Sequence, residues 1–409
     1  MDALVLFDDG AVGLSPLSDL RASFELRTGA MTIGERASAR LGRPAEAAIV
    51  PAALAPLLAM RFEGEVNRLP ERALAPDEAY LLVNGRWASV DASVPVALNT
   101  ATVDAEGGVV AARLDRARAE AFIAGGGGLP DGVDVEPREG AALMSRPWHV
   151  LDAMLGGNLE GDLAWMIAER VDLSPFDAEG HRHAAVIGEG PVRVGRDVRV
   201  QPFVAFNTLK GPIVIDHGVE INAHAVVYGP CYIGPNTVLH NRADVGCSAV
   251  GPRCKLGGEV NVCVFQGLSN KSHSGYLGHS VVGEWVNLGA STVTSNLKNT
   301  FGEVAMRTDP VGVPEKTGRQ FLGSILGDHV RTAIGTRLMT GSCVHTGAMV
   351  AVSGYAPKCV PRFAFLTDAG DQRYVLDKFV LIADRMMQRR GRRVGAELVQ
   401  RLAELYAGA

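Results

Sequence analysis

The clearest pattern in the chain is an aliphatic residue at every sixth position, each followed by a small or polar one. An α-helix repeats every 3.6 residues and a strand every two, so neither element alone explains this spacing. It is typical of a hexapeptide solenoid, in which three short strands form a triangular coil and the aliphatic side chains point to its axis. The uninterrupted run consists of Ile215, Ile221, Val227, Ile233, Leu239 and Val245.

The same phase returns further along the chain, at Leu326, Thr332, Leu338, Val344 and Val350. Two stretches, 203–212 and 300–321, break it. Loops ejected from such coils commonly carry function, so we expect both stretches to cover a binding cleft. The pattern predicts a parallel β-helix over residues 184–360.

Before the β-helix, residues 1–140 read as an α/β domain. We expect strands at 3–7, 47–50 and 79–85 and a helix at 32–41. Residues 124–132, AGGGGLPDG, predict a surface loop; a phosphate cradle is disfavoured because no Lys-Ser/Thr follows.

The two remaining segments are predicted to be helical. Residues 141–183 form a linker, and 361–409 a tail with apolar residues at helical spacing. We expect the tail to dock on the last coil and cap its open edge.

Composition narrows the possible partners. The 40 basic and 45 acidic residues give a net charge of −5, which leaves no broad basic field for nucleic acid or an anionic membrane. The basic run 385–393 falls in the helical tail, where it predicts a solvated face. The start of the chain does not resemble a signal peptide, and 47–60 is too short to cross a membrane. Without a CxxC pair, the six cysteines favour a reduced, cytoplasmic protein.

Polar residues gather in segment 257–299, beyond what a coil surface requires. His273, Tyr276, Asn287 and Asn296 fall within about one and a half coils. A neutral His can accept the proton of an attacking amine, while Asn and Tyr position the acceptor and backbone N–H groups stabilise an oxyanion. Glu259 is placed to fix the tautomer of His273. The alternative is that these groups only solvate the coil.

The segment resembles the acetyltransferase half of the bifunctional GlmU-like proteins, N-acetylglucosamine-1-phosphate uridyltransferase/glucosamine-1-phosphate acetyltransferases. The resemblance lies in His273, Tyr276, Leu277-Gly278, Asn287-Leu288-Gly289-Ala290 and Asn296. Residues 324–344 resemble the closing coils of that family, and the amino-terminal LFDDGAVGLSPLSDLRASFELRTGAMTIGER resembles a divergent branch of sugar nucleotidyltransferases.

This resemblance implies roles for individual residues. His273 would be the general base, Glu259 its orienting carboxylate, and Ala290 the point where the backbone meets acetyl-CoA. Tyr276, Asn287 and Asn296 would contact the sugar phosphate. The resemblance also implies a left-handed coil and a homotrimer with acyl sites between subunits.

Charged positions depart from the family pattern. The substrate lysine of the family is Asn261 here, and Lys271 and Lys298 are candidates to supply the missing phosphate charge.

The nucleotide site departs further from the family. The chain has no G-x-G-T-x-M loop, and Asn84-Gly85-Arg86 stands where relatives carry the Asp that holds Mg²⁺. We expect a substitute site in which carboxylates hold metal and arginines hold phosphate, or else ordinary ion pairs that close the first strand. The residues concerned are Asp8, Asp9, Arg21 and Arg27.

The favoured function is acetyl-CoA-dependent N-acetylation of an amino-sugar 1-phosphate; coupled nucleotidyl transfer from UTP with Mg²⁺, giving a UDP-sugar, stays open. One alternative is a non-catalytic sugar-nucleotide sensor or assembly protein. Another is a zinc enzyme of the γ-carbonic anhydrase type. Its candidate ligands are His217, His224, His240, His273 and His279.

Overall fold

The computed structural model describes residues 2–72, 74–75, 77–181 and 183–408. They divide into two compact units. The first comprises Met1–Leu14, Leu20–Leu26 and Met31–His149, and the second comprises Ser15–Asp19, Arg27–Ala30 and Val150–Ala409. Two short amino-terminal segments therefore belong with the β-helix, which a division near residue 140 does not anticipate.

The first unit is built on one mixed sheet in the order β3-β2-β1-β4-β6-β5-β7. β1 pairs in parallel with both β2 and β4, while β6 runs antiparallel to β4 and β5. The strands are β1 (Ala3–Phe7), β2 (Ala45–Ile49), β3 (Glu65–Val66), β4 (Tyr80–Asn84), β5 (Thr100–Val103), β6 (Val109–Leu114) and β7 (Asp134–Pro137). The helices are α1 (Ile33–Leu41), α2 (Ala55–Ala59) and α3 (Arg116–Ala124). The strands and the helix predicted for this segment are confirmed.

Helix α1 begins where the sequence signals it. The Thr32 side chain accepts a hydrogen bond from the Glu35 backbone N–H, and Glu35 accepts one from Thr32. This reciprocal pair satisfies two amide groups that a helix start otherwise leaves without partners. Gly42, at φ +64°, ends the helix in the left-handed region.

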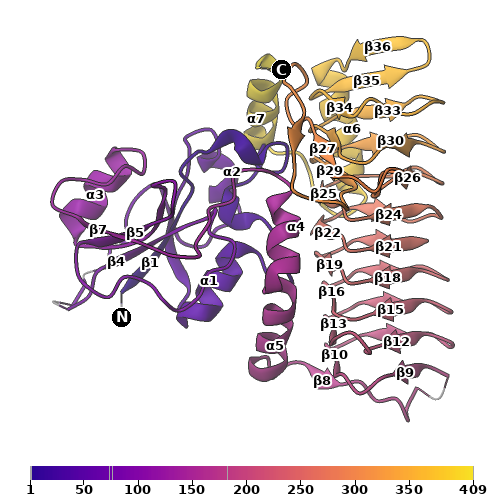
Figure 1. The fold of residues 1–409 in the computed structure, drawn as a ribbon, viewed down its shortest axis with the longest axis horizontal. Coiled ribbons are helices and arrows are strands. Elements are labelled where there is room, and N and C mark those ends of the chain that lie inside the picture. Colours follow the sequence, from indigo (N-terminus) through magenta and orange to yellow (C-terminus); the bar gives the residue numbers. More distant parts are fainter. Residues whose placement is uncertain (1, 73, 76, 182, 409) are drawn as a thin grey trace. The chain divides into compact units, whose positions relative to one another are not determined.

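The second unit is a stack of coils (Figure 1). Its strands form three faces, and within each face neighbouring coils pair their strands in parallel. The first face contains β8 (Ser174–Pro175, antiparallel), β10 (Val192–Val194), β13 (Ile213–Ile215), β16 (Cys231–Ile233), β19 (Ala249–Val250), β22 (Val264–Gly267), β25 (Val281–Glu284), β29 (Ser324–Leu326), β32 (Ser342–Val344) and β34 (Cys359–Val360). The second contains β11 (Arg199–Val200), β14 (Glu220–Ile221), β17 (Val238–Leu239), β20 (Lys255–Leu256) and β23 (Asn270–Lys271), then β30 (Arg331–Thr332), β33 (Met349–Ala351) and β35 (Ala364–Thr367). The third contains β9 (Ala185–Ile187), β12 (Ala205–Asn207), β15 (Val226–Tyr228), β18 (Asp244–Gly246), β21 (Glu259–Asn261) and β24 (Tyr276–Gly278), then β26 (Val293–Thr294) and β31 (Arg337–Leu338).

The six-residue phase places its aliphatic residues on the coil axis. Ile215, Ile221, Val227 and the other members of the run have no exposed surface and form one core with Val260, Leu277 and Val344. Their burial supplies the main stabilisation of the coils. The predicted fold, an α/β nucleotidyltransferase-like domain followed by a left-handed parallel β-helix, is confirmed.

Helices flank the coils. α4 (His149–Ala153), a π-helical segment (Met154–Asn158) and α5 (Leu159–Glu169) precede them, and α5 contacts β13 and β16. Of the linker predicted to be helical over 141–183, residues 149–169 are confirmed as helix, whereas β8 lies in the predicted range as a strand. Within the described residues, no helix has the length and apolar character needed to cross a membrane.

The carboxyl-terminal tail differs from the prediction. It begins with a hairpin of β35 and β36 (Gly370–Arg373), and β36 lies at the edge that the helix was expected to cap. The helices α6 (Leu376–Gln388) and α7 (Ala396–Ala407) follow. Along α6, Phe379 packs on Phe363 near the last coil and Met387 packs with Leu268 and Trp285 several coils earlier. The amphipathic helix therefore covers the side of the stack, because its apolar stripe is longer than one coil edge.

Candidate functional site

The outward-facing residues of the third face form two columns. In β15, β18, β21 and β24 the middle residue is buried, while the residues on either side of it point out of the coil. Strand pairing stacks Asp244, Glu259 and Tyr276 in one column. Neighbouring strands lie about 4.8 Å apart, so these side chains are within reach of one another or of one ligand. The second column consists of Tyr228, Gly246, Asn261 and Gly278.

Tyr276 and Asn296, both predicted site residues, are in direct contact. Asn296 Nδ2 donates a hydrogen bond of 2.7 Å to Tyr276 Oη and lies 2.8 Å from His279 Nδ1. Burial, with a smaller contribution from Arg319, lowers the pKa of His279 to about 4, so its neutral ring accepts the second Asn296 proton. Phe321 stacks on that ring at 5.2 Å. Among the described residues, the Tyr276 hydroxyl proton and Asn296 Oδ1 have no hydrogen-bond partner, so both can bind a ligand.

Burial, together with the charges of Cys263 and Glu259, raises the pKa of Tyr276 to about 12. The phenol therefore stays protonated at neutral pH and can donate a hydrogen bond. Its ring lies over Gly278 in its own strand, where a Cβ would be 2.1 Å from the hydroxyl oxygen. Glycine at this position makes room for the tyrosine.

His273 lies in the turn between β23 and β24, at the corner where the second and third faces meet. Its side chain is exposed. Gly258, at φ +67°, lies directly against this turn, since a Cβ there would be 2.9 Å from Ser274 Cα and 3.0 Å from the His273 carbonyl oxygen. The glycine thus permits two turns of neighbouring coils to stack closely.

The polar neighbours of His273 differ from the prediction in one respect. Among the described residues, no hydrogen bond joins Glu259 to His273, although Glu259 and Tyr276 are in register. His240 lies close enough for the charge of His273 to contribute to lowering its pKa, after burial and Lys255. The orienting role of Glu259 therefore stays a prediction.

Four further predicted residues do not join this cluster. Lys271 is only 2% exposed, because it pairs in register with the core residue Leu256 and points into the coil. Its Nζ donates to the carbonyl oxygens of Gly257 and His273, each at 2.7 Å. Burial lowers the pKa of Lys271 to about 8. A phosphate outside the coil cannot reach this ammonium group, which corrects the expected position of Lys271.

The other three lie around the corner or beyond it. Asn287 belongs to the second face, where its Oδ1 accepts a hydrogen bond of 3.2 Å from Asn270 Nδ2. The Ala290 carbonyl accepts from the Gly335 backbone N–H, and Lys298 Nζ donates to the Glu303 carbonyl at 2.9 Å. Single-chain geometry thus pairs Tyr276 with Asn296 and leaves Asn287 on the other side of the His273 turn.

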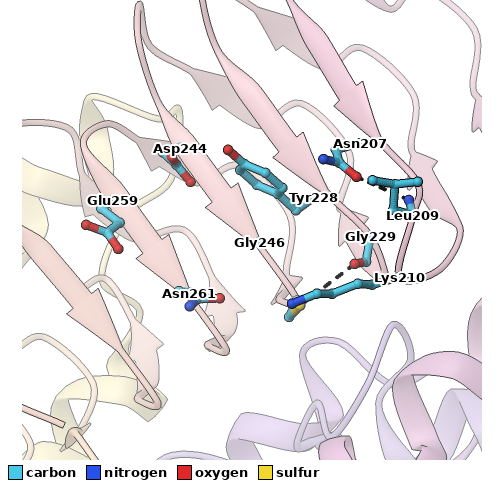
Figure 2. Close-up of a pocket in the computed structure, with 10 residues that line it drawn as sticks. Asn207, Leu209, Lys210, Tyr228, Gly229, Asp244, Gly246, Glu259 and Asn261 are labelled. Carbon is cyan, nitrogen blue, oxygen red and sulfur yellow. Dashed lines mark hydrogen bonds between the residues drawn. The ribbon is translucent and has the colours of Figure 1, made fainter. Parts of the chain in front are cut away.

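A cleft of about 340 Å³ opens on the third face, next to Glu259 (Figure 2). Two stretches were expected to cover a cleft, and one of them, 203–212, supplies part of the wall. The other, 300–321, contains the paired strands β27 (Ala305–Met306) and β28 (Glu315–Lys316) and supplies no lining residue among those described. Sequence reasoning missed most of its lining, although the six-residue phase already marks the positions beside each core aliphatic as outward-facing. The lining residues are Asn207, Leu209, Lys210, Tyr228, Gly229, Asp244, Gly246, Cys247, Glu259 and Asn261.

The charges in this cleft are mixed. Asp244 and Glu259 lie side by side, and burial raises the pKa of Asp244. Lys210 is the cation among the described lining residues, and Tyr228 and the two asparagines add neutral hydrogen-bonding groups. Adjacent carboxylates and amides suit an amine and hydroxyl groups better than a phosphate alone.

The amino-terminal carboxylates Asp8 and Asp9 are engaged by neighbouring groups of the first unit. Asp8 accepts hydrogen bonds from the backbone N–H groups of Gly10 and Ser23. Asp9 forms an ion pair of 2.6 Å with Arg86 and accepts a hydrogen bond from Asn84 Nδ2. Although burial opposes it, the Arg86 guanidinium holds the pKa of Asp9 below its usual range, whereas burial raises that of Asp8.

These carboxylates do not fit a Mg²⁺ site, because their oxygens are already engaged by amide and guanidinium donors. In the described part of a single chain, no group of three His, Cys, Asp or Glu could hold a metal ion. Arg21 is buried in the first unit. Arg27 belongs to the second unit, where its guanidinium lies 5.6 Å from the Tyr232 ring and its backbone bonds with Gln266. Arg86, rather than Arg27, is the arginine that pairs with Asp9.

Three of the histidines considered as zinc ligands contact different groups, whereas His240 lies near His273. His217 Nε2 lies 2.6 Å from Asp172 and near Arg170, and His224 stacks on Phe203 at 5.0 Å. His279 belongs to the Asn296 cluster.

Comparison with known proteins shows what parts of this chain are similar to. Residues 4–171 match the sugar nucleotidyl transferase family. Over part of its length, the chain is similar to GlmU-like proteins. It is 32% identical over 145 residues to a bifunctional sugar-1-phosphate nucleotidylyltransferase/acetyltransferase of Sulfurisphaera tokodaii, covering 32% of this chain and 33% of the relative. It is 28% identical to a bifunctional GlmU protein of Methanococcus vannielii, covering 39% and 38% of the two chains.

A third relative, a bifunctional GlmU protein of Mycolicibacterium vanbaalenii, is 26% identical over 281 residues, covering 60% of this chain and 50% of that protein. The chain thus spans between a third and a half of the length of these curated relatives. Among solved structures, an Arabidopsis UDP-N-acetylglucosamine acyltransferase covers 52% of the chain at 13% identity and a TM-score of 0.22.

Proposed function

We propose that this chain transfers an acetyl group from acetyl-CoA to the amine of an amino-sugar 1-phosphate at the His273 corner of the β-helix. The observation that carries the proposal is the contact between Tyr276 and Asn296 next to the exposed imidazole of the adjoining turn. Two carboxylates, Glu259 and Asp244, continue the column of Tyr276 on the neighbouring strands. The match to bifunctional nucleotidylyltransferase/acetyltransferases supports the same chemistry.

In the proposed reaction, a nitrogen of the neutral His273 ring accepts a proton from the acceptor amine as that amine attacks the thioester carbonyl. The carbon–sulfur bond then breaks, and the CoA thiolate takes up the proton from the imidazolium. Tyr276, through its free hydroxyl proton, and Asn296, through Oδ1, hold the acceptor in place. Asp244 and Glu259 accept hydrogen bonds from the neutral amine and the hydroxyl groups of the incoming sugar.

The proposed assembly is a homotrimer, as in the family implied by the sequence, with each acyl site completed by a neighbouring subunit. For nucleotidyl transfer, the family match over 4–171 is the support. Because Asp8 and Asp9 do not fit a metal site, no nucleotidyl step is assigned to them.

The test is release of the CoA thiol by the full chain with acetyl-CoA and glucosamine 1-phosphate. His273→Ala is expected to lower the rate about 10²- to 10⁴-fold, the usual contribution of a general base. His224→Ala is the matched control, since it is another exposed corner histidine, and it should retain the wild-type rate.

Full activity of His273→Ala would disprove the assignment. Calorimetric binding of acetyl-CoA or UDP-N-acetylglucosamine without turnover would favour the sensor function instead.

A further inference from the structure

Two cysteines lie side by side near the end of the first face, outside the site described above. Cys343 in β32 pairs in register with Cys359 in β34. The next residues in these strands, Val344 and Val360, belong to the coil core, so both thiols point outward. Paired strands are about 4.8 Å apart, within the Cα separation of about 4.4–6.8 Å that a disulfide requires.

The imidazole of His345 lies near both thiols. His345 Nε2 lies 3.7 Å from Cys343 Sγ and 3.8 Å from Cys359 Sγ. The ring is 4% exposed, and its Nδ1 has no hydrogen-bond partner within the described residues. Because Nε2 is the nitrogen that faces both sulfurs, it can accept a thiol proton.

The surroundings distinguish the two sulfurs. The hydrogen bond from Cys343 is the main cause that lowers the pKa of Cys359 to about 5, and His345 adds to it against the effect of burial. The pKa of Cys343 is raised by the same contact and by burial. Cys359 is half-buried at the edge strand, whereas Cys343 is fully buried behind it.

The remaining cysteines, all of which are described, lack this arrangement. Burial raises the pKa of Cys231, Cys254 and Cys263 to about 12. Cys247 is half-buried like Cys359, but its sulfur faces only the Gly229 carbonyl, and its pKa is raised. Cys247 therefore provides an internal control of similar exposure.

We propose that Cys359 and Cys343 form a site of reversible oxidation by hydroperoxides, with His345 as the proton acceptor and Cys343 as the resolving thiol. The Cys359 sulfur attacks the terminal peroxide oxygen; the O–O bond breaks, and the leaving alkoxide or hydroxide takes the proton held by His345. The sulfur of Cys343 then attacks the sulfenic acid; its S–O bond breaks and water leaves. Two thiols and one hydroperoxide thus give one disulfide, one alcohol or water, and one further water.

The disulfide would tie the last strand of the first face to its neighbour. Two residues beyond that strand, Arg362 forms an ion pair of 2.7 Å with Asp19, which also accepts a hydrogen bond of 2.8 Å from Thr346. Segment Ser15–Asp19 is thereby fixed beside the oxidation site in the same unit. Oxidation would therefore add a covalent bond close to the contact between segment Ser15–Asp19 and the coils.

The first experiment compares the cysteines of the full chain by iodoacetamide labelling at pH 6.5, followed by peptide mass analysis. Cys359 is expected to react at least ten times faster than Cys247. Equimolar hydrogen peroxide should remove 2 Da and yield a peptide in which Cys343 is linked to Cys359, and dithiothreitol should reverse both changes. Equal labelling of the two cysteines, or oxidation without the linked peptide, would overturn the proposal.

Variants separate the roles. Cys343→Ser should trap sulfenic acid on Cys359, detected with dimedone, while Cys247→Ser should behave as wild type. His345→Gln should slow the labelling of Cys359 about tenfold and leave that of Cys247 unchanged. Circular dichroism checks folding of each variant. Stoichiometric zinc that protects both thiols in the purified chain would also overturn the proposal, because the cluster would then be a metal site.

Discussion

Two polar clusters, one in each unit, differ in how they use their hydrogen-bonding groups. In the first unit, Asp9, Asn84 and Arg86 satisfy one another at the end of β1 and β4. On the third face of the β-helix, Tyr276 and Asn296 share one bond, and within the described part of the chain they keep a donor and an acceptor without partners, near the exposed His273. The first arrangement holds backbone in place, while the second is open to a ligand. A structural cluster and a candidate site therefore differ in whether their polar groups already have hydrogen-bond partners, rather than in their residue types.

The largest effect on this comparison is expected from Arg86→Ala. The side chains of Arg86 and Asp9 are only 13% and 21% exposed, so the variant leaves a largely buried carboxylate without its partner. We expect a loss of about 3 kcal/mol in the free energy of unfolding, measured by urea titration with hydrogen exchange of β1 and β4. Arg68→Ala removes the exposed pair with Glu65 and should cost below about 1 kcal/mol. Equal losses would show that the Asp9 cluster is not structural.

A second prediction concerns the buried Lys271, whose pKa of about 8 lies below its ordinary 10.5. Between these pH values the unfolded chain binds more protons than the folded one, so stability should rise as pH increases from 8 to 10.5. The expected rise is about 2 to 3 kcal/mol, from the size of the shift. It is measured as the difference between wild type and Lys271→Met in urea titrations across this range. Lys255→Met, at an exposed position one coil earlier, should show the same rise in stability with pH as the wild type. Loss of that rise in Lys255→Met would contradict this account.

Gly278→Ala tests whether the Tyr276 ring position matters for function. The added Cβ would be 2.1 Å from the hydroxyl oxygen and must displace the ring from Asn296. We expect acetyl transfer to fall about tenfold, equivalent to about 1.4 kcal/mol. Gly354→Ala, at a glycine with open space around it, should change nothing measurable. An unaffected Gly278→Ala rate would remove Tyr276 from the site.

The smallest effect is expected from Tyr276→Phe, which deletes one hydroxyl and leaves the ring. Loss of one hydrogen bond corresponds to about 1 kcal/mol, or roughly a fivefold higher KM for the acceptor sugar, with the KM for acetyl-CoA unchanged. Tyr355→Phe is the control, because that tyrosine is 66% exposed on a different part of the coil. A change in the acetyl-CoA KM alone would assign Tyr276 to the other substrate.

Part of the candidate site was predictable from the sequence, and the misplacement of Lys271 has a physical cause. The motif containing His273, Tyr276 and Asn296 indicated residues that the structure places at one corner and the adjoining face. Lys271 was misplaced because the coils differ in length: Asp244 pairs with Glu259 over a shorter stretch of chain than Glu259 with Tyr276. After a short coil, a fixed repeat therefore no longer predicts which side chains point into the coil and which point out. Lys271 pairs in register with the buried Leu256 and points inward.

The sequence by itself determined the coil axis, because burying one aliphatic residue in every six is a local and repeated requirement. It also determined helix α1 and the strands β1, β2 and β4 of the first sheet, whose signals lie within a few neighbouring residues. Only the tertiary structure decided which outward residues share a column, that Arg86 pairs with Asp9, and that Cys343 faces Cys359. These pairings depend on coil length and on contacts between distant segments, which no local pattern encodes.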